Sequence, residues 1–406
     1  MDGFLAALFL RAGYNTALVT VGAAILGASA GAIGSFVLLR KRSLVSDAIS
    51  HSTLPGLALA FIVMAALTGD GRWLPGLMIG AALSAGLGLL VVDWLTARTR
   101  LAEDAAIGAV LSVFFGAGVV LMTVIQTLQT GRQAGLSSYL LGSTAGMLRS
   151  EAQIIAVAAA IIGLAIFLLR RPFTLVCFDP EYAAVRGVNV RATDLVMMAL
   201  LMAVTVIGLK VAGLVLIVAL TIIPPVAARF WTNRPGRMVV IAAGLGALAA
   251  WLGAVLSSLD RGLPTGSLIV LSAFALFVLS LTLSPRRGLL AGIAHRLRFH
   301  GLVHERQGLL ALARGEPIYD AQTLRRLRAR GYIRPDGVAT PEGSAAAALA
   351  RHDEARWGLY RDLYPEEAAG SPSQGIRPLA EVLPPDIIAD LDDRLIAQAD
   401  LAGGRA

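Results

Sequence analysis

The sequence predicts an all-α polytopic membrane protein with eight to nine transmembrane helices, followed by a smaller C-terminal domain of ordinary soluble composition. The first observation is that 56% of the 406 residues are hydrophobic and only 15% are charged, with a mean hydropathy of +0.71. A water-soluble chain of this length carries far more charge. The second is that residues 1–284 hold 18 Lys and Arg and 11 Asp and Glu, whereas residues 285–406 hold 17 and 16.

Long apolar runs give the expected positions of the helices. About 20 mainly apolar residues are needed to cross a hydrocarbon core roughly 30 Å thick. The sixth and seventh runs meet at Lys210, so a total of eight spans stays open. Gly and Ala dominate many runs, as is typical of closely packed membrane helices. The nine runs cover residues 16–39, 47–67, 74–96, 105–128, 152–169, 194–209, 211–230, 238–258 and 266–284.

The loops between the runs predict the orientation in the membrane. Positive residues concentrate in loops on the cytoplasmic side. If Arg40, Lys41 and Arg42 are cytoplasmic, the loops on that side hold twelve Lys and Arg residues and the opposite loops hold five. With nine spans, the N-terminus is then expected outside and the C-terminal tail in the cytoplasm.

Asp47 and His51 are the polar pair that most needs an explanation within the apolar runs. They lie four residues apart in SLVSDAISHSTLPG, which places both side chains on one face of a helix. A carboxylate and a neutral imidazole can supply two ligands to Mn²⁺, Fe²⁺ or Zn²⁺. The same pair is also consistent with a structural ion pair or a proton relay. Spacing alone does not decide among these three interpretations.

Two proline positions are expected to disturb the spans. Pro55 and Gly56 follow His51 within a turn and predict a helix break that frees backbone carbonyl groups beside the pair. Pro224 and Pro225 predict a distortion of the seventh span, which could be a gate or a bend.

A further loop, residues 170–191, is the longest on the predicted cytoplasmic side within the membrane domain. Its segment FDPEYAAVRGV predicts a short amphipathic helix that begins at Asp179, Pro180 and Glu181 and ends at Gly187. Such a helix is suited to docking onto a partner protein, and equally to lying in the interface without one.

The sequence contains no motif for an enzyme with its own energy source. Its two lysines, Lys41 and Lys210, do not follow glycine, so a Walker A phosphate loop is excluded. The HExxH motif is absent, and the single cysteine, Cys177, excludes a disulfide framework. Energy for transport would therefore come from a partner or from a gradient.

Three segments resemble the ABC-3 family, the membrane permeases of bacterial ABC importers for manganese, zinc and iron. The resemblance covers essentially residues 10–284, and the segments occur in the order of the family's motifs. They read GSFVLLRKRSLVSDAISHSTLPGLALAF, FDPEYAAVRGV and GLKVAGLVLIVALTIIPPVAARF.

The resemblance implies a permease in the bacterial plasma (inner) membrane that carries a divalent metal ion as substrate and holds no permanent cofactor. It implies a second permease subunit, identical or different, a cytoplasmic ATPase and an extracytoplasmic solute-binding protein. By position, Asp47 and His51 match the family's Asp and His for metal passage. The stretch 179–187 matches the loop that docks on the ATPase.

The tail resembles another family. Residues 304–406 follow a linker at 285–303 and are similar to winged-helix proteins, with a continuation similar to the dimerisation helices of diphtheria-toxin-repressor-type regulators. Val382 follows Glu381 where that family usually has histidine. A basic helix would offer phosphate contacts, yet the tail as a whole is nearly neutral, so we expect protein contacts rather than DNA. The arginines of this basic helix are Arg325, Arg326, Arg328 and Arg330.

Two other functional classes are consistent with the residues. A proton-coupled secondary carrier would use Asp47 and His51 as a relay and work without an ATPase. A membrane-anchored metal-responsive regulator would act through residues 304–406. The sequence leaves the identity of the metal and the remaining ligands open.

Overall fold

The computed structural model describes residues 2–68, 73–127, 147–260, 263–285, 287–370 and 375–403. Across these ranges the secondary structure is helical, with one isolated antiparallel bridge between Ile333 and Ala339. The chain divides into two compact units, residues 1–291 and 292–406. The division falls inside the predicted linker at 285–303.

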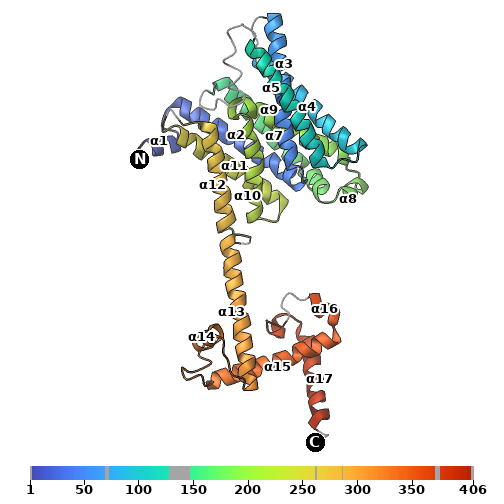
Figure 1. The fold of residues 1–406 in the computed structure, drawn as a ribbon, viewed down its shortest axis with the longest axis vertical. Coiled ribbons are helices and arrows are strands. Elements are labelled where there is room, and N and C mark those ends of the chain that lie inside the picture. The colour runs from blue at the N-terminus through green and yellow to red at the C-terminus, as the bar shows by residue number, and fades with distance from the viewer. Residues whose placement is uncertain are drawn as a thin grey trace. The chain divides into compact units, whose positions relative to one another are not determined.

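The first unit is built from the helices α1 to α12 (Figure 1). Eight of them, within the described residues, are long and apolar enough to cross a membrane: α2, α3, α4, α5, α7, α9, α11 and α12. The predicted seventh run corresponds to α10, which is shorter. The bounds are α1 Asp2–Leu8, α2 Tyr14–Leu39, α3 Ser43–Thr68, α4 Leu74–Arg98, α5 Glu103–Thr127, α7 Arg149–Phe178, α8 Pro180–Val185, α9 Val190–Ala212, α10 Leu214–Trp231, α11 Pro235–Ser257 and α12 Thr265–Leu283.

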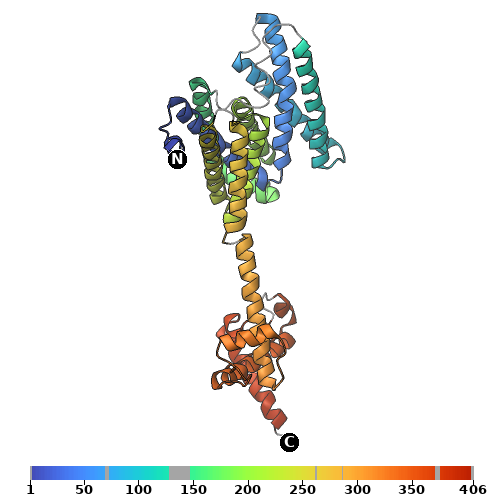
Figure 2. The ribbon, with the colours of Figure 1, turned by 60° about the vertical axis from the view of Figure 1, so that its left-hand side comes forward.

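Helix α2 lies at the centre of one group of helices, packed against α11, α10, α7 and α9. Helices α3, α4 and α5 form a second group, which Figure 2 shows as a blue to green bundle beside the first. Helix α9 contacts members of both groups. The side of the membrane that each loop faces stays a prediction.

Glycine lets α2 approach its neighbours backbone to backbone. A Cβ atom on Gly27 would overlap the carbonyl group of Gly246 in α11, and one on Gly31 would overlap that of Ala242. A Cβ atom on Gly34 would overlap the carbonyl oxygen of Thr221 in α10. These contacts explain why the small-residue run of the first span packs so closely.

We expect Gly34→Ala to destabilise the membrane unit by about 1–3 kcal/mol, because the added methyl group must push α2 away from α10. The melting temperature of the purified protein in detergent measures the effect. Gly116→Ala is the matched control, because an added Cβ at Gly116 meets nothing within 4 Å. Equal melting temperatures for the two variants would contradict the close packing of α2 on α10.

The second unit is helical around a small core. Its helices are α13 Leu289–Arg314, which begins just before the division, α14 Ala321–Ala329, α15 Pro341–Leu363, α16 Pro365–Gly370, the 3₁₀ helix η3 Leu379–Glu381 and α17 Pro385–Gly403. The indole nitrogen of Trp357, buried in α15, donates to the carbonyl oxygen of Arg377 at 3.0 Å. Trp357, Tyr360, Ala368, Leu379 and Leu391 form the core.

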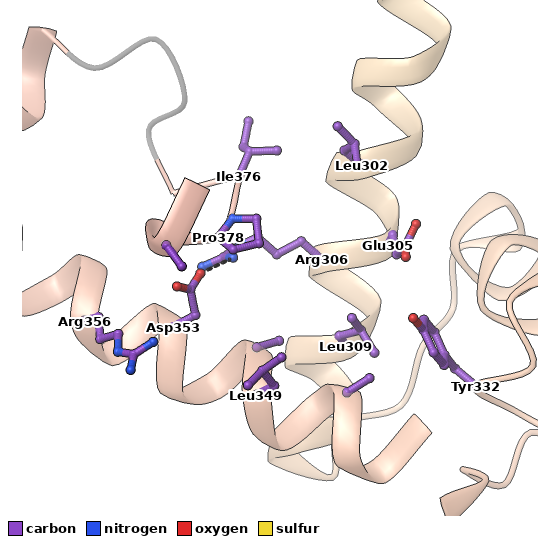
Figure 3. Close-up of a pocket in the computed structure, with 13 residues that line it drawn as sticks. Leu302, Glu305, Arg306, Leu309, Tyr332, Leu349, Asp353, Arg356, Ile376 and Pro378 are labelled. Atoms are coloured by element: carbon purple, nitrogen blue, oxygen red, sulfur yellow. Dashed lines mark hydrogen bonds and ion pairs between the residues drawn. The ribbon is translucent and has the colours of Figure 1, made fainter. Parts of the chain in front are cut away.

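A cavity of about 320 Å³ lies between α13, α15 and the segment around Pro378 (Figure 3). Arg306 crosses it to donate to Asp353 at 2.9 Å and also to Glu354 at 2.9 Å. The second oxygen of Asp353 accepts from the backbone N–H of Leu379 at 2.8 Å. These charged groups therefore satisfy one another and join α13 and η3 to α15.

Arg356 in α15 and Asp392 in α17 form a two-pronged ion pair, and His352 lies 3.3 Å from the same carboxylate. The Arg356 guanidinium holds the pKa of Asp392 below its usual value. A carboxyl group with a lowered folded-state pKa contributes stability above the unfolded-state pKa of about 3.9 and loses that contribution as pH falls through the folded-state pKa.

We therefore expect the second unit to melt at a lower temperature below about pH 4 than at pH 6. Asp392→Asn should have a lower melting temperature than the wild type at pH 6, and its melting temperature should fall less between pH 6 and pH 4. Asp390→Asn is the control, because Asp390 pairs with Arg394 inside α17 itself. Fluorescence of Trp357 in full-length chains with the other tryptophans changed to Phe reports the transition. If the melting temperature of Asp392→Asn falls with pH as much as that of the wild type, the Arg356–Asp392 ion pair is not the source of the pH dependence.

Candidate functional site

Asp47 and His51 lie one turn apart on α3, as their spacing predicts. The Nε2 atom of His51 is 3.3 Å from Oδ1 of Asp47, and their side chains are 19% and 37% exposed, respectively. Helix α3 packs between α4 and α5 and also contacts α9 and α10. The polar pair thus lies on a helix that packs against four other helices of the membrane unit.

The second nitrogen of His51 is the most informative atom of the site. Its Nδ1 atom is buried and has no hydrogen-bond partner, while the ring makes a T-shaped contact with Phe115 of α5 at a centroid distance of 4.9 Å. When Nε2 carries the proton that it donates to Asp47, the Nδ1 lone pair remains available to a cation. In the described part of the chain, no group of three or more His, Cys, Asp or Glu side chains could hold a metal ion. One copy thus offers no closed cage, and Asp47 and His51 could ligate one ion together only after Nε2 leaves Asp47, because Nδ1 lies on the other side of the ring.

Hydroxyl groups of α3 lie before, between and after the two residues of the pair. Ser46 Oγ lies 2.7 Å from Thr221 Oγ1, which links α3 to α10. Ser50 and Thr53 are buried, and their hydroxyl groups donate to carbonyl oxygens of the preceding turn of α3. Sequence reasoning missed Ser46 and Thr221. The signal was the density of Ser and Thr in SLVSDAISHST, but the partner on α10 is 175 residues away.

The predicted break at Pro55 and Gly56 is wrong. Helix α3 continues through Pro55 from Ser43 to Thr68. The break is avoided because a proline in a helix interior removes one hydrogen bond without necessarily ending the helix. Pro55 gives no N–H to the carbonyl oxygen of His51, so this oxygen lies beside the pair without that bond. Gly56 serves packing instead, because a Cβ atom there would overlap the carbonyl group of Gly80 in α4.

Pro224 and Pro225 also lie inside a helix, α10, which continues across both. The helix does not end at these prolines, and the distortion of this span, as a gate or a bend, stays a prediction. The interruption occurs earlier, at Gly213, whose φ of 77° ends α9 and precedes α10. Glycine adopts this conformation without a steric cost. Pro225 leaves the carbonyl group of Thr221 without its helical donor, and this is the group that packs against Gly34.

The predicted short helix at 179–187 is confirmed as α8. Asp179 accepts the N–H of Tyr182 at 2.8 Å, Pro180 occupies the first turn beside Glu181, and Gly187 ends the helix with a φ of 79°. Ala183 is buried. Three large side chains on and beside this helix are exposed: Phe178, Tyr182 and Val185. The helix therefore presents an apolar surface outside the bundle.

An ion pair ties the start of α3 to the region of α8. Arg40, between α2 and α3, donates to both carboxylate oxygens of Asp194 on α9 at 3.0 and 2.8 Å and to the carbonyl oxygen of Val176 on α7. The side chains of Arg40 and Asp194 are 21% and 15% exposed. The helices that flank α8, α7 and α9, are thus connected by one side chain to the loop that leads into α3.

Comparison with known proteins gives consistent matches over the first unit. The chain is 40% identical over 298 residues to the manganese transport system membrane protein MntC of Bacillus subtilis (strain 168), covering 73% of this chain and 67% of that protein. It is 35% identical over 292 residues to the zinc transport system membrane protein TroC of Treponema pallidum (strain Nichols), covering 72% and 96%.

Among solved structures, PsaBC from Streptococcus pneumoniae in complex with Fab matches with a TM-score of 0.61 at 28% identity, over 70% of this chain and 97% of that one. Residues 14–284 match the ABC 3 transport family. The match includes α3 with its Asp and His pair and α8 with its exposed apolar side chains. The chain therefore belongs to the ABC 3 transport family.

Proposed function

We propose that the chain is the membrane-spanning permease subunit of an ABC importer for a divalent transition metal ion, Mn²⁺, Zn²⁺ or Fe²⁺. The observation that carries this proposal is the Asp47 and His51 pair, with its unpartnered Nδ1, on a helix of the membrane unit. The relatives named for manganese and zinc transport support this substrate class.

Asp47 and His51 act as transient ligands in this proposal. A carboxylate oxygen and an imidazole nitrogen suit all three ions. Transport requires that the ion leave the site again, so an incomplete shell completed by water or by another subunit is more useful than a closed cage. The carbonyl oxygen of His51, left without a donor by Pro55, is a further oxygen on the same helix.

Helix α8 is the proposed docking point for a cytoplasmic ATPase subunit. The cap formed by Asp179, with Pro180, Glu181 and Gly187, fixes a short rigid helix whose exposed apolar side chains suit a groove on a partner. The chain lacks a phosphate loop, so ATP hydrolysis would belong to that partner. A second permease subunit and an extracytoplasmic solute-binding protein complete the proposed importer in the bacterial inner membrane, with the C-terminal tail in the cytoplasm.

The winged-helix interpretation of residues 304–406 stays a prediction, because the family match ends at residue 284. Arg326 and Arg330 on α14 lie 3.9 and 3.5 Å from the carboxylate of Glu305 on α13. These arginines are partly neutralised, which supports protein contacts over a DNA phosphate backbone as the role of this unit.

Uptake of radioactive manganese, zinc and iron tests the function in cells that express the chain with its neighbouring ATPase and binding-protein genes. We expect uptake of at least one metal to need both the chain and a hydrolysis-competent ATPase. Uptake that persists without the ATPase and collapses with an uncoupler would instead establish a proton-coupled carrier. If none of the three metals enters in any combination, the proposal fails.

A further inference from the structure

The segment that joins the membrane unit to the tail has its own charge pattern. Residues 285–304 contain four arginines, Arg286, Arg287, Arg296 and Arg298, and no Asp or Glu. The following residues, 305–406, contain 13 Arg and 16 Asp and Glu. Positive charge is therefore concentrated in the 20 residues that directly follow the last span, while the remainder of the tail is slightly acidic.

The first half of α13, which this segment forms, lacks a packing partner in the described structure. Every residue from 292 to 300 is exposed, and the first buried residue of the helix is Gly301. Leu289, Ile293 and Leu297 follow one another at four-residue spacing and are 54%, 55% and 67% exposed, with Leu290 at 57% beside them. An apolar stripe on a helix is normally covered by another part of the protein or by another surface.

The distance along the chain places this stripe close to the bilayer. The last span, α12, ends at Leu283 and α13 begins at Leu289, so five residues separate them. Even fully extended, this connection reaches only about 20 Å. Arg296 and Arg298 are exposed and, in the described part of the chain, neither is paired with a carboxylate. An apolar face with free arginines beside a membrane matches the chemistry of an interfacial helix.

A second copy of the chain is a poorer match for the stripe. A coiled coil would continue the pattern of Leu290, Ile293 and Leu297 for at least three heptads. The next positions of that seam are His300 and His304, which interrupt it. The charge pattern instead complements anionic lipid headgroups, near which each Arg contributes to binding.

We propose that residues 289–300 of α13 form an interfacial helix that lies on the anionic leaflet of the bilayer, with Leu289, Ile293 and Leu297 in the acyl boundary. This interaction goes beyond the transport function and does not depend on it. The full chain in nanodiscs provides the test, with Cys177→Ser as background. Single cysteines then carry a polarity-sensitive fluorophore, either Leu297→Cys on the apolar face or His295→Cys on the opposite face as matched control.

The expected result is a blue-shifted fluorophore at position 297 that is quenched by lipid-borne quenchers in discs of phosphatidylcholine with phosphatidylglycerol. The fluorophore at 295 should remain accessible to water. Changing Arg296 and Arg298 together to Gln should lower the ratio of bilayer-bound to free helix by roughly 30-fold at low salt. High salt should weaken the binding in the same direction.

Two outcomes would overturn the proposal. One is equal water exposure of the fluorophores at 297 and 295 in every lipid mixture. The other is efficient disulfide cross-linking between copies through Cys at 297, without lipid quenching, which would assign the stripe to a second copy. Leu297→Cys and His295→Cys both change exposed side chains. A size-exclusion elution volume and a melting temperature equal to those of Cys177→Ser show that each variant is folded.

Discussion

Replacing His51 with alanine is expected to reduce metal uptake by about 100-fold. Even the loss of a group that only orients a metal ligand commonly lowers metal affinity or activity by about 10- to 100-fold. The change removes Nδ1, the buried nitrogen without a hydrogen-bond partner, and leaves Asp47 without its 3.3 Å neighbour. Initial rates of radioactive metal uptake at matched membrane abundance measure the effect. Asp47→Asn should lower uptake in the same way, because it removes the negative charge from the pair.

Ser50→Ala is the matched control for His51→Ala. Ser50 precedes His51 on the same helix and is buried, but its hydroxyl group donates only to the carbonyl oxygen of Ser46 in the preceding turn. Its loss should leave uptake within about twofold of wild type, since removing one such local bond changes stability by only about 1 kcal/mol. If His51→Ala and Ser50→Ala transport equally well, the pair is a structural ion pair and the proposed ion path is wrong.

Arg40→Ala is expected to destabilise the membrane unit by about 3–5 kcal/mol, since it leaves the largely buried carboxylate of Asp194 without its partner. Asp194 also raises the pKa of Arg40, chiefly through the side-chain hydrogen bonds. The measured quantities are the yield of folded protein and its melting temperature in detergent. Arg40→Lys should rescue only part of the loss, because an ammonium group cannot reproduce the two-pronged contact.

Arg42→Ala supplies the comparison for this ion pair. Arg42 pairs with Glu103, whose side chain is 39% exposed, so the loss should be at most about 1 kcal/mol. The double variant Arg40→Leu with Asp194→Leu should recover much of the stability lost in Arg40→Ala. If Arg40→Ala melts at the wild-type temperature, the pair does not hold α9 against the entrance to α3.

The residues that could be placed from sequence are those whose signal is local. The spacing of Asp47 and His51 predicted that both lie on one face of a helix. Asp179, Pro180 and Gly187 predicted where α8 begins and ends. The break at Pro55 was wrong, because whether a proline ends a membrane helix depends on how neighbouring helices and groups satisfy the freed backbone atoms, which the local sequence does not show. Contacts such as Ser46 with Thr221 and Arg40 with Asp194 join residues more than 150 positions apart, so periodicity could not reveal them.

The glycine contacts between α2 and α11 have a consequence for any conformational change. Gly27 and Gly31 meet α11 through backbone atoms, so this contact contains no side chains that could change rotamer and accommodate sliding. The two helices should behave as one rigid body and serve as a fixed reference frame during transport. Distances between spin labels on α2 and α11 should stay constant across the cycle, whereas those from α2 to α3, which joins a different group of helices, should report the movement.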